Sequence, residues 1–191
     1  IQQSQSLITT GINGTVNACF DDKNGMFSLD LLMSAKGLNS NLNAIEDLIN
    51  SESNIHGIVC VPRHSNPTGH TFSDDNVEQL FKLIEPLKEN FSIFWDNAYA
   101  CHDIEDTIQQ TPADQIAKKI GLENNLFQVG STSKITLAGS GISFISSSAD
   151  NLSKFIDFRN AITPGPNKMN QGMHVKYFEL VSIEQQMSEL K

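Results

Sequence analysis

Three short apolar runs, each followed at once by a polar loop, constrain the fold of this chain more than any other feature. The runs lie at 56–62, 91–95 and 126–129. Continuous apolar runs of this length are typical of strands that are buried on both faces of a sheet. Helical patterns at 74–90 and 112–120 separate them. Strands that alternate with helices predict an α/β fold, a three-layer sandwich with a mostly parallel sheet and helices on both faces.

The segments on either side of this repeat add further predicted elements. Their evidence is apolar alternation for strands and apolar spacing of three to four residues for helices. The predicted elements are an edge strand at 15–20, a helix at about 41–51, a strand at 142–145, a helix at 149–158 and a last helix at about 167–190.

The length of 191 residues suits one ordinary domain and is short for two. We interpret residues 41–166 as the core of that domain. Residues 1–40 are rich in polar residues and glycine, and we assign them no role. The last helix, within 167–191, would suit a connector to a second domain that this sequence does not contain. The first residue is Ile, and we expect the chain to be a fragment of a longer protein.

The acidic composition argues against partners that need a basic face. The formal net charge is −9 and the isoelectric point is about 4.9. We therefore expect neither nucleic acid nor a membrane as a partner. No apolar run approaches the roughly 20 residues that span a bilayer. Three cysteines are too few, and odd in number, for a disulfide framework, so we expect a soluble, cytoplasmic protein.

A metal site is not expected. Cys101, His102 and Asp103 are adjacent, and His64 and His70 lie in an earlier loop. The paired ligand spacing that zinc sites use is nevertheless missing. We interpret His64 and His102 as loop residues near a ligand crevice.

Polar residues follow each of the three apolar runs. In a parallel sheet, ligands bind beyond the carboxyl ends of the strands. The loops after the three predicted strands lie at that edge. The topology therefore predicts that Asn66, Asp96, Tyr99 and Lys134 converge on one crevice, although they are far apart in the sequence.

Lys134 and the two serines before it indicate the ligand. A lysine amine can form an imine with an aldehyde when its surroundings keep part of it uncharged. The hydroxyls of Ser131 and Ser133 suit a bound phosphate. Together they suggest pyridoxal 5'-phosphate, which carries both groups. A nucleotide P-loop is not favoured, because Ser133 stands where that motif needs the glycine before its lysine.

The other requirements of pyridoxal phosphate can also be assigned. Asp96, at a strand end, would keep the pyridine nitrogen protonated, so that the ring withdraws electrons from the substrate. Tyr99 and Asn66 would hydrogen-bond the ring oxygen. Lys134, once freed by substrate, could move a proton between the substrate's α-carbon and the cofactor.

Each of these residues also has an ordinary structural interpretation. Lys134 alone would be a solvated loop lysine, and the two serines before it would be turn residues. Asn66, followed by proline and glycine, would be part of an ordinary turn. Asp96 would cap the next helix, and Tyr99 would be a half-buried packing residue. The occurrence of three such motifs in one order favours the functional interpretation.

These motifs resemble successive signatures of the fold-type I, class I aminotransferases that depend on pyridoxal phosphate. The residues that carry the resemblance are Ser65-Asn66-Pro67-Thr68-Gly69, Asp96-Asn97-Ala98-Tyr99 and Ser131-Thr132-Ser133-Lys134. The segments 57–62, 95–100 and 130–139 most resemble a bacterial aspartate aminotransferase subgroup. The likeness runs from about Leu42 to Phe178.

The resemblance implies a pyridoxal-phosphate-dependent transferase large domain. It implies transfer of an amino group between an amino acid, aspartate-like here, and a 2-oxo acid, by an enzyme that is usually a homodimer. Ile142 stands where many relatives place a phosphate-binding arginine, and Arg63 and Arg159 are the two arginines of the chain. The family's earlier phosphate loop, its ring-stacking aromatic residue and its substrate-binding arginine are not identifiable. We therefore expect this chain alone to be inactive.

Two other functions stay open at this point. One is a non-catalytic module that keeps the fold for binding or dimerisation, as part of a regulator with a pyridoxal-binding domain. The other is a lyase or decarboxylase of the same fold, because the bond that is broken depends on how the substrate is oriented.

Overall fold

The computed structural model describes residues 6–10, 16–21, 26–28, 38–51, 55–66, 69–104 and 108–190. Within these residues the strands form one sheet in the order β1-β2-β3-β4-β5-β6-β7. The strands are β1 (Ser6–Thr10), β2 (Val16–Asp21), β3 (Met26–Ser28), β4 (Gly57–Cys60), β5 (Ser92–Asp96), β6 (Leu126–Ser131) and β7 (Ser143–Ser146).

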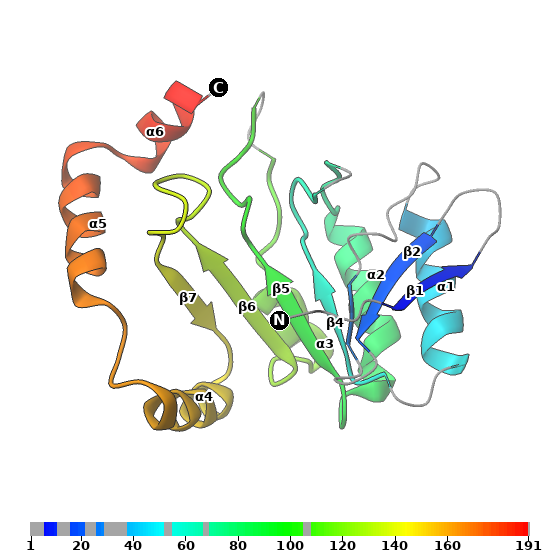
Figure 1. The fold of residues 1–191 in the computed structure, drawn as a ribbon. Coiled ribbons are helices and arrows are strands. Elements are labelled where there is room, and N and C mark those ends of the chain that lie inside the picture. The colour runs from blue at the N-terminus through cyan, green and yellow to red at the C-terminus, as the bar shows by residue number, and fades with distance from the viewer. Residues whose placement is uncertain are drawn as a thin grey trace.

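The centre of the sheet is parallel. β3, β4, β5 and β6 pair in parallel, whereas β1, β2 and β3 pair antiparallel and β7 returns antiparallel to β6. The α/β class and the mostly parallel sheet are thus confirmed, with β4, β5 and β6 at the predicted apolar runs (Figure 1). The predicted strand at 15–20 is β2, which lies between β1 and β3 rather than at the edge.

The helices in the described residues follow the predicted order. They are α1 (Leu38–Ser51), α2 (Asp74–Ile84), α3 (Ala113–Ile120), α4 (Ala149–Ile162), α5 (Lys168–Leu180) and α6 (Ile183–Leu190). α1, α2 and α3 pack side by side along the sheet, and α4, α5 and α6 lie at its β7 end (Figure 1).

The ends of α2 follow from its sequence. The Ser73 hydroxyl accepts the Asn76 N–H, and the Asn76 side chain accepts the Ser73 N–H, which forms a capping box. Asp74 and Asp75 in the first turn complement the positive end of the helix dipole. The predicted helix at 74–90 ends as an α-helix at Ile84, because Pro86 turns the next residues into a 3₁₀ turn, Glu85–Leu87.

The single helix predicted at 167–190 is wrong, because the structure has two helices, α5 and α6, with a break at Val181. Ser182 begins a second capping box. Its hydroxyl accepts the Gln185 N–H at 3.1 Å, and Gln185 Oε1 accepts the Ser182 N–H at 2.9 Å. This cap satisfies the first N–H groups of α6 and so favours a new helix start over a continuous helix.

The core lies between the sheet and α2 and α3. Ile58 on β4, Ile93 on β5 and Phe81 on α2 are fully buried. The Trp95 ring on β5 contacts the edges or faces of two phenylalanine rings, with centroid distances of 5.9 Å to Phe72 and 5.6 Å to Phe81. Trp95 is therefore a core residue.

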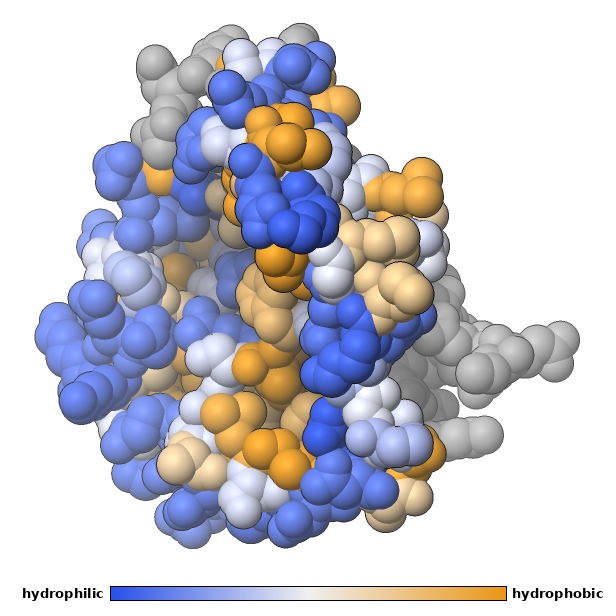
Figure 2. All heavy atoms as spheres, turned by 90° about the vertical axis from the view of Figure 1, so that its left-hand side faces the viewer, coloured by the Kyte–Doolittle hydropathy of each residue, from blue (hydrophilic) through white to orange (hydrophobic). Residues whose placement is uncertain are grey.

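Apolar side chains are exposed over α4 and α5 (Figure 2). The exposed residues of these two helices include Phe155, Ile156, Phe158, Ile162, Met169, Met173 and Leu180. Among the described residues, no helix combines the length and the apolar character needed to cross a membrane.

We predict that Phe81→Ala lowers the free energy of unfolding by about 3–5 kcal/mol, because a fully buried ring is lost and a cavity remains. The matched control is Phe158→Ala, since Phe158 is 67% exposed and its loss should change stability by at most about 0.5 kcal/mol. Urea unfolding followed by the fluorescence of Trp95, the one tryptophan of the chain, measures both. Equal effects of the two substitutions would contradict this description of the core.

Candidate functional site

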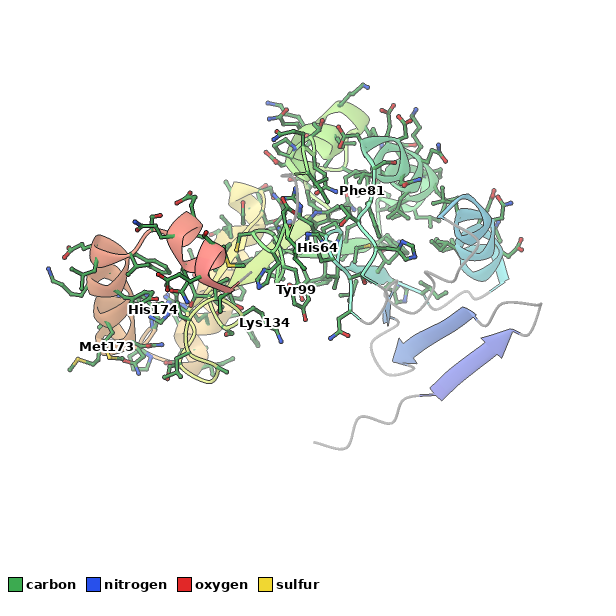
Figure 3. The ribbon with its side chains drawn as sticks, turned by 90° about the horizontal axis from the view of Figure 1, so that it is seen from above. His64, Phe81, Tyr99, Lys134, Met173 and His174 are labelled. Carbon is green, nitrogen blue, oxygen red and sulfur yellow. The ribbon has the colours of Figure 1, made fainter. Side chains whose placement is uncertain are left out.

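The loops that follow β4, β5 and β6 meet at one edge of the sheet, at the top of Figure 1. A cavity of about 600 Å³ opens there. Its lining comes from all three loops and from α6, and consists of His64, Gly69, His102, Asp103, Ile104, Lys134, Met187 and Leu190. Figure 3 shows His64, Tyr99 and Lys134 in this region, seen from above.

The loop after β4 is held by its own backbone. The Gly69 N–H donates to the Ser65 carbonyl at 2.5 Å, and the Ser65 N–H donates to the His70 carbonyl at 2.9 Å. Gly69 has a φ of +72°, a conformation that favours glycine. This turn leaves Ser65 buried and Asn66 exposed at the edge of the sheet.

The loop after β5 follows Asp96, the last residue of the strand, which is half-buried. Asp96 Oδ1 accepts the N–H of Ala98 at 3.0 Å, so the carboxylate caps the turn that follows. Within the described residues no donor reaches Oδ2 of Asp96. The ordinary structural interpretation of Asp96 as a cap therefore accounts for one carboxylate oxygen and not for the other.

The loop after β6 is a helical turn around Lys134. The Thr132 carbonyl accepts the N–H groups of Ile135 at 3.0 Å and Thr136 at 2.9 Å. The Thr132 N–H donates to the Ile142 carbonyl at 2.9 Å, and this bond closes the loop at its base. Lys134 thus projects from a fixed turn, and its side chain is exposed.

Lys134 lies against Tyr99. The Nζ atom of Lys134 is 5.7 Å from the centroid of the Tyr99 ring, a cation–π distance. The Tyr99 ring also packs against His102, edge to face, with centroids 5.4 Å apart. The structure therefore brings together two of the residues that the sequence singled out, from the loops after two different strands.

The other predicted residues lie at the same edge of the sheet. Asn66 lies in the loop after β4 and Asp96 is the last residue of β5, but neither lines the cavity. Ser131 and Ser133 precede Lys134, and the Ser131 hydroxyl accepts the Ser133 N–H at 3.4 Å, as a turn residue would. Lys134 is the member of the predicted set that lines the cavity directly.

Asp103 ties the loops after β4 and β5 together. It accepts hydrogen bonds from His64 Nε2 at 2.7 Å and from the Ile108 N–H at 3.0 Å, and Arg63 lies 3.4 Å away. Burial acts to raise the pKa of Asp103, but these hydrogen bonds and the Arg63 charge outweigh burial. They hold the pKa of this carboxyl below its ordinary value.

The guanidinium of Arg63 bonds to other residues of the chain. It donates to the carbonyls of Ala100, at 2.8 Å, and Ile108, and it pairs with Asp103. Arg63 therefore fastens two loops together and does not present its guanidinium to the cavity. Arg159, the other arginine, lies on α4 and donates to Asn160. Neither arginine offers a carboxylate anchor beside Lys134.

Sequence reasoning missed two contacts that shape this site. The bond between His64 and Asp103 joins residues 39 apart, and the bond between Thr132 and His174 joins residues 42 apart. For the first contact the sequence did hold a signal, because Arg63-His64 and His102-Asp103 follow neighbouring strands and offer hydrogen-bond donors opposite a carboxylate. His174, in the middle of a helix, offers no comparable signal.

We predict that Asp103→Asn lowers the free energy of unfolding at pH 7 by about 1–3 kcal/mol, because it removes a hydrogen-bonded, paired carboxylate that is 10% exposed. The folded pKa of Asp103 is lowered, so its stabilising effect is present above the unfolded pKa and is lost as the pH falls through the folded pKa. The difference between the urea midpoints of the two proteins, measured from pH 7 to pH 3, should therefore begin to narrow as the pH falls below about 4. The exposed Asp157→Asn is the control, and a difference that does not narrow in acid would contradict the assignment.

We predict that Gly141→Ala disrupts the Lys134 loop. A Cβ at Gly141 would collide with the Ser133 hydroxyl and lie 2.7 Å from the Ser133 backbone nitrogen, so the loop must shift. The expected loss of stability is about 1–3 kcal/mol. Gly172→Ala is the matched control, because no atom lies within 4 Å of a Cβ there and α5 should gain up to about 1 kcal/mol. Thermal unfolding compares the two, and equal midpoints would argue against a close approach at Gly141.

Comparisons with known proteins agree on one family. A family model described as aspartate amino-transferase matches residues 22–189. A protein of Mycolicibacterium smegmatis that is named as an aminotransferase is 40% identical over 139 residues, which are 72% of this chain and 32% of that protein. An aspartate aminotransferase of Corynebacterium glutamicum is 36% identical over 138 residues, with the same coverage of 72% and 32%.

Solved structures show the same fold. An aspartate transaminase of Corynebacterium glutamicum superposes with a TM-score of 0.65 and 33% identity, over 77% of this chain and 34% of that chain. An α-aminoadipate aminotransferase of Thermus thermophilus, solved in complex with N-(5'-phosphopyridoxyl)-L-leucine, superposes with a TM-score of 0.64 over 78% and 36%. Its identity of 17% supports the fold alone.

The chain spans about a third of the length of the curated relatives it matches. The match to the family model, in contrast, covers most of the chain, including all three loops of the site. The chain therefore belongs to the aspartate amino-transferase family, as a fragment of about a third of its relatives' length.

Proposed function

We propose that this chain is the cofactor-binding part of an aminotransferase that uses pyridoxal 5'-phosphate. In the complete protein it would move an amino group between an aspartate-like amino acid and a 2-oxo acid, and we propose a homodimer as its assembly. The observation that carries the proposal is the position of Lys134. Its amine lines a cavity at the carboxyl edge of a parallel sheet and lies 5.7 Å from the Tyr99 ring.

The residues present fit this cofactor. The cavity beside Lys134 has a volume of about 600 Å³, within the range of small-molecule sites. A half-buried carboxylate, Asp96, keeps one oxygen available at the same edge. The solved neighbour from Thermus thermophilus holds a phosphopyridoxyl compound on the same fold.

We assign one role to each predicted residue. Asp96 would pair with the pyridine nitrogen, and Tyr99 and Asn66 would hydrogen-bond the ring oxygen. Ser131 and Ser133 would hold the phosphate. Lys134 would be the residue that bonds to the cofactor's aldehyde. The cofactor supplies an aldehyde and an electron-withdrawing ring.

The protein's own contribution is orientation and proton transfer. The turn at Thr132 fixes the backbone of Lys134, so its amine can return to one place in each cycle. With its amine free, Lys134 would serve as the base that moves a proton from the substrate's α-carbon. The capping bond from Ala98 holds the Asp96 carboxylate in one rotamer.

The proposal predicts that pyridoxal phosphate gives a lysine-dependent visible absorption band with this chain. Lys134→Ala should abolish the band without loss of stability, because the Lys134 side chain is exposed. Lys168→Ala, which removes another exposed lysine, should leave it unchanged. Borohydride reduction and peptide mapping should place the label on Lys134. A label mainly on another lysine would refute the assignment.

Addition of aspartate to the loaded protein separates the candidate functions. A band that aspartate bleaches supports amino transfer from an aspartate-like substrate. Because this chain alone is expected to be inactive, a band that aspartate does not move in this chain leaves the reaction open, whereas the same result with the complete protein favours the non-catalytic binding module. One observation supports this second candidate. Arg63 is bonded to the Ala100 carbonyl and to Asp103, so its guanidinium is not presented to a substrate carboxylate. In the complete protein, release of ammonia or carbon dioxide in place of 2-oxo acid formation would favour a lyase or decarboxylase of the same fold.

A further inference from the structure

A buried histidine on α5 is bonded to the loop of Lys134. The buried polar or charged residues in the described part of the chain are Ser65, Thr132 and His174, and two of these contact each other. His174 Nε2 lies 2.8 Å from the Thr132 hydroxyl and 3.2 Å from the Thr136 hydroxyl. These two threonines bracket Lys134 in the sequence. Figure 3 shows His174 on α5, beside the loop of Lys134.

The hydrogen bonds define the donor and acceptor of each group. His174 Nδ1 lies 2.9 Å from the Asn170 carbonyl, one turn earlier on α5, and a carbonyl can only accept. Nδ1 therefore carries the proton, and in the neutral ring Nε2 accepts. The Thr136 hydroxyl donates to the Thr132 carbonyl at 2.9 Å. This leaves the Thr132 hydroxyl as the donor to His174 Nε2.

Thr132 connects the hydrogen bond from His174 to the base of the loop. Its hydroxyl, while donating to His174, accepts the Ile142 N–H at 3.0 Å, and its own N–H donates to the Ile142 carbonyl at 2.9 Å. Its carbonyl accepts the N–H groups that form the turn around Lys134. Every polar group of Thr132 thus makes a hydrogen bond. Of these bonds, the one to His174 connects the loop to α5.

We propose that His174 is a positioning residue that fixes the turn carrying Lys134 through the Thr132 hydroxyl. His174 lines a separate cavity of about 300 Å³, together with Leu137, Met173 and Tyr177, and not the cavity of Lys134. It therefore acts on Lys134 through the loop and not by contact with a ligand in the cavity of Lys134. Its consequence for the reactivity of Lys134 rests on the proposed function.

Two substitutions separate the two ends of the imidazole. His174→Asn keeps a donor near the position of Nδ1 for the Asn170 carbonyl but loses the acceptor for Thr132. His174→Gln places an amide oxygen near the position of Nε2 and keeps that acceptor. Thr132→Val removes the hydroxyl from the other side with little change of shape.

The first measurement is amide hydrogen exchange without cofactor, so it does not depend on the proposed function. His174→Asn should speed exchange at Ile135, Thr136 and Ile142 by about five- to tenfold, as loss of one buried hydrogen bond allows. Exchange at Ile93, which is bonded to the Asn125 carbonyl in the sheet, should stay at the wild-type rate. His174→Gln should restore slow exchange at the loop. His174→Asn combined with Thr132→Val should be no faster than Thr132→Val alone.

The second measurement is the rate at which pyridoxal phosphate and borohydride label Lys134, together with the absorption maximum of the loaded chain. His174→Asn should slow the labelling and shift the maximum, and His174→Gln should restore both. Any of three results would overturn the proposal. The loop amides of His174→Asn could exchange at the wild-type rate, exchange at Ile93 could be accelerated as much as at the loop, or His174→Gln could fail to restore slow exchange at the loop. If wild-type Lys134 is never labelled while the exchange results hold, the proposed function fails and the positioning role stands.

Discussion

The register between β4, β5 and β6 is the constraint on which the rest of this structure depends. Cys60 pairs with Trp95, and Asp96 pairs with Val129, so the three strands end at the same edge. The pairing is maintained by burial, since Ile58 and Ile93 are fully covered and Phe81 of α2 packs on Trp95. A slip of one residue would reverse which side chains face that core. Apolar packing therefore determines where the three strands end, and so where the loops of the site begin.

At that edge the loops are held by polar contacts. Asp103 joins the loops after β4 and β5, and Thr132 closes the loop after β6 at Ile142 and joins it to α5. This division has a physical reason, because loop backbones cannot be buried without partners for their N–H and C=O groups. Lys134 can therefore be exposed and still be fixed in position, since its neighbours in sequence carry the bonds.

The sequence was sufficient for the elements whose signal is local. The apolar runs predicted β4, β5 and β6, and the helical pattern at 74–90 predicted the start of α2, because periodicity acts over a few residues. The break at Val181 also has a local cause, the Ser182 and Gln185 cap, which the prediction of one long helix overlooked. The clamp on Asp103 and the contact of Thr132 with His174 were not predictable in the same way. They depend on tertiary packing between residues about 40 apart.

Two sets of contacts, one at Asp103 and one at His174, position the residues around Lys134. On one side, Arg63 and His64 hold Asp103, which keeps the β5 loop, with Tyr99, close to the β4 loop. On the other side, α5 holds Thr132 through His174. The distance of 5.7 Å between Lys134 Nζ and the Tyr99 ring depends on both sets of contacts, because one positions the loop of Tyr99 and the other positions the loop of Lys134. A change on either side would therefore alter the same distance, although Asp103 and His174 share no contact. Geometry at this lysine is thus a property of three loops and a helix, and not of the short motif that contains it.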